Sequence, residues 1–103
     1  MKIDKELKCL YCKEEITLKE ILENSKEAWL NQKRISFNCP ICKENSYIEM
    51  KGKTVSIGML EGAPGPGFIE YNKIKPSNFS YKVTSQEIIV NFNYKTWHIK
   101  AKA

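Results

Sequence analysis

The chain has 103 residues, enough for one domain or for one domain built from two small halves. Hydrophobic residues make up 42% and charged residues 28%, an ordinary balance for a globular protein, and no apolar run is long enough to span a bilayer. The formal net charge is +5. Residues 1–51 carry ten Lys and Arg against nine Asp and Glu, whereas residues 52–103 carry seven Lys against three Glu. The basic C-terminal half favours acidic partners such as nucleic acid, or it serves solubility alone.

The N-terminus, MKIDKELKC, is charged from the start and lacks the apolar run of a signal peptide. We therefore expect a cytoplasmic protein. In a reducing compartment, four cysteines are expected to hold a metal ion and not to form disulfides.

Short elements are predicted in the N-terminal half. Residues 6–8, ELK, are expected to form a strand before the first cysteine pair, and EEI leads out of that pair. Thr17 and Glu20 form a possible capping box. The apolar spacing after it predicts one or two short helices within residues 17–32, with Trp29 at the centre of their buried stripe.

From residue 34 onward the hydrophobic period changes to two, which indicates strands. RISFN and SYIEM flank CPICKE, so the second cysteine pair is expected at the tip of a β-hairpin. KTVSIGML, residues 53–60, is predicted as a strand with Val55, Ile57 and Met59 on one face. The EGAPGPGF segment after it is predicted as a structured loop, since a phosphate-cradling loop would need Gly-Lys-Ser/Thr.

The remaining residues predict an antiparallel β meander with one buried and one solvated face. FIEYNKI precedes a break at KPSN, and turns are expected at residues 84–86 and 93–95. The side chains expected on the buried faces are Phe79, Tyr81, Val83, Ile88, Val90, Phe92, Tyr94, Trp97, Ile99 and Ala101. The side chains expected in solvent are Lys82, His98, Lys100 and Lys102. Together these elements predict an α+β, mostly β fold.

All four cysteines lie in two matched segments, KCLYCKEE and NCPICKEN. In Cys-x-x-Cys the backbone turns tightly and aims both sulfurs at one point, and two such turns complete a tetrahedron of thiolates about 2.3 Å from a metal ion. Backbone N–H groups that donate to the sulfurs disperse the negative charge of such a site.

The pairs Cys9-x-x-Cys12 and Cys39-x-x-Cys42 resemble the two knuckles of a zinc ribbon, over about residues 6–50. The resemblance implies that these four cysteines bind one structural Zn²⁺. It also implies a zinc-ribbon-like half over residues 1–52, with a short helical insertion, followed by a β half over 53–103. The chain departs from the ribbon pattern in Lys13 and Lys43, which stand where knuckles often place Gly.

The four cysteines allow two other chemistries. CPIC also resembles a glutaredoxin-like Cys-Pro-x-Cys motif, but thiol redox chemistry requires a helix at the motif, and the residues after Cys42 predict a strand. Iron or an iron–sulfur cluster is a further alternative. A catalytic zinc site keeps one position open for water, whereas four cysteines close it. His98 is the only histidine, and we expect no enzyme.

Two functional hypotheses follow. The first is a small protein-interaction or assembly module that binds another protein through the C-terminal half and the GAPGPG loop. The alternative is a nucleic-acid-binding zinc ribbon, which would need the lysines of the C-terminal half to form one patch. The candidate contact residues for nucleic acid are Lys73, Lys75, Lys82, Lys95, Lys100 and Lys102. No membrane contact and no small-molecule substrate are predicted.

Overall fold

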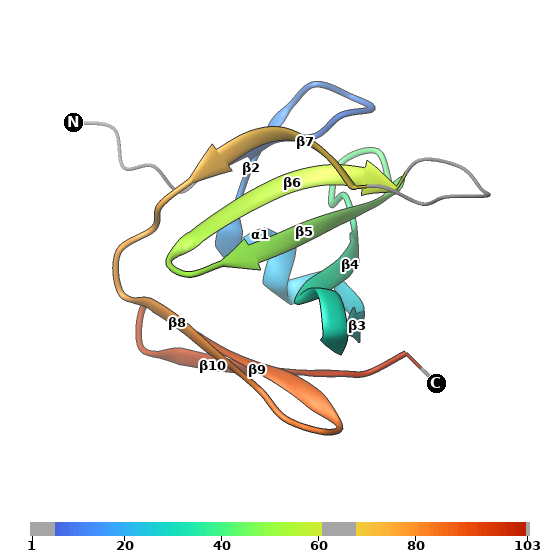
Figure 1. Cartoon of the computed structure of the whole chain (residues 1–103). Coiled ribbons are helices and arrows are strands. Elements are labelled where there is room, and N and C mark those ends of the chain that lie inside the picture. Colours follow the sequence, from blue (N-terminus) through green and yellow to red (C-terminus); the bar gives the residue numbers. More distant parts are fainter. Residues whose placement is uncertain (1–5, 61–67, 103) are drawn as a thin grey trace.

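The computed structural model describes residues 6–60 and 68–102, with the side chains of residues 6, 59, 60 and 68–71 left aside. Within these residues the chain forms antiparallel sheets and one short α-helix (Figure 1). The predicted α+β, mostly β fold class is therefore confirmed. The GAPGPG loop, residues 62–67, lies outside the described residues.

The described strands form three sheets. The two-stranded sheet pairs β1 (Glu6–Lys8) with β2 (Glu15–Thr17). The five-stranded sheet has the order β3 (Ser25–Trp29), β4 (Arg34–Asn38), β5 (Asn45–Lys51), β6 (Thr54–Leu60) and β7 (Phe68–Ile74). The three-stranded sheet has the order β10 (Lys95–Lys100), β9 (Glu87–Phe92) and β8 (Phe79–Val83).

The five-stranded sheet contains residues from both predicted halves of the chain. Strands β5 and β6 pair with each other through a tight turn at Gly52 and Lys53, so that Lys51 lies opposite Thr54. Gly52 has φ +57°, a left-handed conformation that glycine adopts at little cost. The division into residues 1–52 and 53–103 stays a prediction.

Helix α1 (Leu18–Glu23) begins at the predicted capping box, which is confirmed. The Glu20 N–H donates to Thr17 Oγ1 over 3.1 Å, and the Thr17 N–H donates to the Glu20 carboxylate over 2.9 Å. Leu18, Ile21 and Leu22 anchor this helix in the core, where their side chains are buried. No helix within the described residues has the length and apolar character that crossing a membrane requires.

The predicted helical segment around Trp29 is wrong. After Asn24, residues 25–29 form strand β3, followed by the 3₁₀ turn η1 (Leu30–Gln32). Strand β3 supplies hydrogen-bonding partners to β4, whose other edge pairs with β5, and this pairing overrides the helical spacing. Trp29 consequently lies on the sheet face opposite the core and stacks on Tyr47, with ring centroids 4.8 Å apart.

One hydrophobic core joins the three sheets and α1. Ile35, Ile48 and Ile57 lie opposite one another on adjacent strands and form its central row, each with no exposed surface. The meander β8–β10 places its apolar face against this core. Its C-terminal end joins the five-stranded sheet through the Lys102 N–H, which donates to the Ala28 carbonyl over 2.8 Å.

The predicted meander is confirmed, with one correction in its second turn. Thr84 forms the first turn, where its N–H donates to the Glu87 carbonyl over 2.9 Å. Asn93 and Tyr94 form the second turn, with φ of 51° and 68°. Tyr94 therefore does not share the buried face of Phe92 and is 97% exposed. The alternation of apolar residues continues in the sequence beyond the end of the strand. The strand itself ends earlier, because both residues of this type of turn leave the extended conformation.

Candidate metal centre

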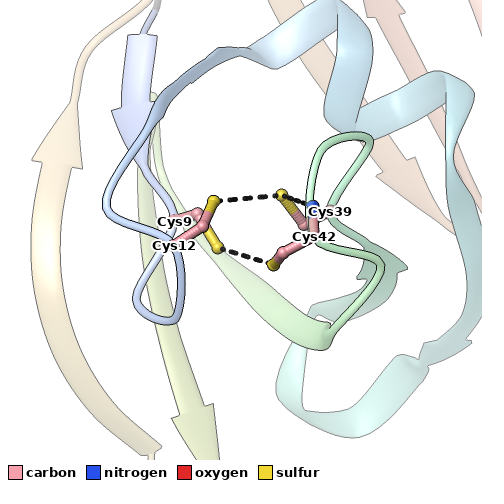
Figure 2. A group of neighbouring side chains, drawn as sticks. All are labelled: Cys9, Cys12, Cys39 and Cys42. Carbon is pink, nitrogen blue, oxygen red and sulfur yellow. Dashed lines mark hydrogen bonds between the residues drawn. The ribbon is translucent and has the colours of Figure 1, made fainter.

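The two cysteine motifs form turns with the same backbone hydrogen bonds. The Cys9 N–H donates to the Glu14 carbonyl over 2.9 Å, and the Cys39 N–H donates to the Glu44 carbonyl over 2.9 Å. The first turn joins β1 to β2. The second joins β4 to β5, which confirms the hairpin predicted there. Each motif is therefore the tip of a β-hairpin, and Figure 2 shows the two tips facing each other.

The lysine after each second cysteine completes its turn. Lys13 and Lys43 adopt left-handed conformations, with φ of 65° and 70°. Their backbone N–H groups donate to the carbonyls of Cys9 and Cys39, over 3.0 and 2.9 Å. Each ammonium group also donates to the carbonyl three residues earlier, over 3.0 and 3.2 Å. Glycine is thus not needed here, because the lysine side chain adds a hydrogen bond where the backbone conformation costs energy.

The four sulfur atoms form one cluster, and two of the distances between them match the edge of a tetrahedral thiolate site. Cys9 Sγ is 3.7 Å from Cys42 Sγ, and Cys12 Sγ is 3.8 Å from Cys39 Sγ (Figure 2). All four sulfurs lie within 4.8 Å of one another. A tetrahedron with metal–sulfur bonds of about 2.3 Å has edges of about 3.8 Å. All four cysteines are free and could therefore hold one metal ion.

Backbone N–H groups favour the charged form of the sulfurs. The Tyr11 N–H donates to Cys9 Sγ over 3.4 Å, and the Ile41 N–H donates to Cys39 Sγ over 3.4 Å. Burial raises the pKa of Cys39, but the N–H groups of Cys42 and Ile41, together with the thiols of Cys9 and Cys42, outweigh it and lower that pKa to about 7. The pKa of Cys39 is thus lower than the pKa values of Cys12 and Cys42, which are both raised.

Deprotonation of a second thiol in the cysteine cluster is unfavourable unless a cation is bound there. The Glu14 N–H lowers the pKa of Cys12, but burial and the thiols of the other cysteines outweigh it and raise that pKa to about 12. A divalent cation supplies the missing charge, because metal binding requires deprotonated thiols and releases their protons. The donor set therefore fits a thiolate-binding metal ion.

The cysteine cluster lies where two sheets meet. Cys9 and Cys39 are buried, whereas Cys12 and Cys42 are partly buried and pack against the core. The first pair belongs to the two-stranded sheet and the second to the five-stranded sheet. An ion held by all four sulfurs would therefore cross-link the two sheets.

Comparisons with known proteins add no assignment. No protein-family model, curated protein or solved structure matches this chain.

The predicted lysine contacts lie on different elements. Lys73 is on β7 of the five-stranded sheet, and Lys75 follows it. Lys82 and Lys100 are exposed on the solvent face of the meander.

The other two predicted lysines pair with carboxylates. Lys95 lies 2.9 Å from the Glu23 carboxylate, and Lys102 lies 3.5 Å from that of Glu27. His98, expected in solvent, lies 3.3 Å from the carboxylate of Glu87 on the neighbouring strand. Two of the six predicted lysines therefore have a carboxylate as a close neighbour.

Other site features were not foreseen in the sequence. Tyr11 and Ile41 occupy the same place in the two turns and are 46% and 54% exposed, so each tip presents an apolar side chain to solvent. The repeat of the motif indicated equivalent positions, but not their exposure. The groove formed by Lys33, Lys53 and β8 brings together segments far apart in the sequence, which no local pattern indicates.

Proposed function

We propose that this chain is a non-enzymatic, zinc-ribbon-like protein that acts as a small interaction or assembly module. One structural Zn²⁺, bound by Cys9, Cys12, Cys39 and Cys42, cross-links its sheets. The observation that carries the proposal is the cluster of four sulfurs within 4.8 Å of one another, with two pairs at 3.7 and 3.8 Å. Four thiolates fill the coordination sphere of Zn²⁺ and leave no position for a reactive water.

The size of the first hairpin supports a structural role for the ion. Strands β1 and β2 have three residues each and bury Leu7 and Ile16. An isolated two-stranded hairpin is at best marginally stable in water. The metal would hold this hairpin against β4 and β5, so that metal binding contributes directly to folding.

The distribution of the lysines supports protein binding over nucleic-acid binding. Phosphate backbones are bound by cations gathered along one path. Here Lys95 and Lys102 pair with Glu23 and Glu27, while Lys73 lies on another sheet. Binding to a protein partner does not require such a continuous row of cations.

Metal removal tests the proposal. A strong chelator should remove the zinc and cause a large fall in melting temperature. Adding zinc back should restore both the bound ion and the original melting temperature. As a matched comparison, magnesium should restore neither, because thiolates select softer ions. A chain that keeps its melting temperature without metal would refute the structural role. Anisotropy with labelled single-stranded DNA at low salt tests the alternative, and tight binding there would favour nucleic acid.

A further inference from the structure

The outer edge of β8 is an unpaired strand edge within the described residues. β8 stands at the end of the strand order β10-β9-β8 and pairs only with β9. An unpaired edge presents a row of backbone N–H and C=O groups to any extended chain that can approach it.

Two hydrogen bonds fix which backbone groups of β8 point toward β9. The Thr84 N–H donates to the Glu87 carbonyl over 2.9 Å, and the Asn93 N–H donates to the Asn78 carbonyl over 3.1 Å. Hydrogen-bonded positions recur at every second residue of an antiparallel pair. The backbone groups of the even-numbered residues of β8 therefore face β9.

The odd-numbered residues of β8 consequently direct their N–H and C=O groups to the open edge. These are Phe79, Tyr81 and Val83. Their side chains point toward the core, where Phe79 is buried and the other two are partly buried. The edge thus combines free backbone groups with an apolar border.

A groove of about 510 Å³ runs along this edge. One wall is β8, with Ser80 and the three odd-numbered residues, and the other wall is formed by Lys33, Gly52 and Lys53. The turn between β5 and β6, which carries Gly52 and Lys53, lies next to β8 in Figure 1. Because the groove has a wall on both sides, it suits one added strand, about 4.8 Å from β8, better than the edge of a second sheet.

The charge of the groove is positive. Lys33 and Lys53 are exposed and line it, and no described Asp or Glu does so. Neither lysine has an ion pair with a described carboxylate. An occupant that carries carboxylates would meet both ammonium groups at once.

We infer that the open edge of β8 receives an extended acidic segment of a partner protein as an added β-strand. This inference rests on the proposed function as an interaction module and names the chemistry of its partner. The segment would bond to the backbone of Tyr81 and Val83, place apolar side chains beside those of β8, and direct carboxylates toward Lys33 and Lys53. Affinity comes from the main-chain hydrogen bonds, and specificity from the alternating side chains.

Peptide binding to the full-length, zinc-loaded protein tests the inference. The probe is a fluorescein-labelled octapeptide of alternating valine and glutamate, and its partner probe replaces glutamate with lysine. The glutamate peptide should bind saturably and at least tenfold more tightly than the lysine peptide. Charge reversal in the double variant Lys33→Glu/Lys53→Glu should weaken it at least tenfold. The double variant Lys26→Glu/Lys100→Glu, with the same net charge but substitutions outside the groove, should bind as the unmodified chain does.

Hydrogen exchange distinguishes an added strand from contact through side chains alone. The bound peptide should slow exchange of the Tyr81 and Val83 amides at least tenfold, while the Lys82 amide, which already faces β9, should change little. Unchanged exchange at Tyr81 and Val83 would overturn the inference. Equal affinity for the two peptides would also overturn the inference. The same holds for a dimer that is detected by sedimentation and forms through the edge of β8. Absence of peptide binding in a sample with one equivalent of zinc overturns the edge inference and leaves the zinc-linked fold intact.

Discussion

Cys9 and Cys39 accept the same hydrogen bond in two turns thirty residues apart. Each sulfur lies 3.4 Å from the backbone N–H of the residue two positions later, which is Tyr11 in one turn and Ile41 in the other. The two turns are therefore duplicates in hydrogen bonding as well as in sequence. Each fixes its sulfur before any ion arrives, so that less conformational freedom is lost on metal binding.

Substitution of a single ligand is expected to cost several kcal/mol of stability. Structural zinc contributes roughly 10–16 kcal/mol in zinc-finger peptides at neutral pH, and Cys39→Ser removes one of the four thiolates. At about 4–8 °C per kcal/mol, the melting temperature should fall by tens of degrees. Differential scanning calorimetry measures this. Ile41→Ala, at a 54% exposed position of the same turn, is the control and should change the melting temperature little.

The second turn of the meander carries backbone strain that glycine would relieve. Tyr94 has φ 68° and is 97% exposed, so its side chain adds little burial while its backbone is in a left-handed conformation. Tyr94→Gly should raise the free energy of unfolding by about 1 kcal/mol. Tyr94→Ala, which removes the ring but keeps the Cβ atom, should give none of this gain. Chemical denaturation compares the two variants, and equal stability would show that the turn is unstrained.

The sequence predicted most elements whose signals are local. The capping box at Thr17, the hairpin of the second cysteine pair and the meander depend on short patterns and were all found. Trp29 was misplaced because a strand at the sheet edge is decided by its partner β4, and not by its own residues. Tyr94 was misplaced because alternation does not reveal where a strand ends.

The sequence also predicted the candidate metal ligands, but not the groove beside β8. Each Cys-x-x-Cys motif forms a tight turn that directs both sulfurs to one point. The spacing of the four cysteines was therefore sufficient to predict that they form one cluster. The groove depends on Lys33 and Lys53, which approach β8 only once the five-stranded sheet and the meander pack together. Contacts between segments that are far apart in the chain produce no periodic pattern in the sequence.

The ion pair between α1 and β10 gives a pH-dependent prediction. A hydrogen bond from Lys95 lowers the pKa of Glu23 from its ordinary value of 4.5, outweighing the effect of burial. Because the pKa is lowered in the folded state, the pair contributes its full stability when the pH is above the ordinary pKa of glutamate. This contribution is lost as the pH falls through the lowered pKa. NMR titration should show the Glu23 pKa return to its ordinary range in Lys95→Met. An unchanged Glu23 pKa in that variant would contradict the contact.

Helix α1 should depend on its buried face for stability. Leu22 is 1% exposed, and Leu22→Ala should lower the free energy of unfolding by about 2–5 kcal/mol, since a cavity replaces the lost side chain. Lys19→Ala, an exposed position in the same helix, should change it by less than about 0.5 kcal/mol. Urea denaturation of both variants gives the comparison. Similar losses in the two variants would place α1 outside the core.

X-ray absorption spectroscopy at the zinc edge, combined with elemental analysis of protein prepared without added metal, tests the central claim most directly. We predict about one equivalent of zinc per chain and a first shell of four sulfur atoms at about 2.3 Å, with no nitrogen or oxygen ligand. Iron in place of zinc would correct the identity of the ion. A metal-free, disulfide-bonded protein, or a shell that includes water, would contradict the closed four-cysteine site.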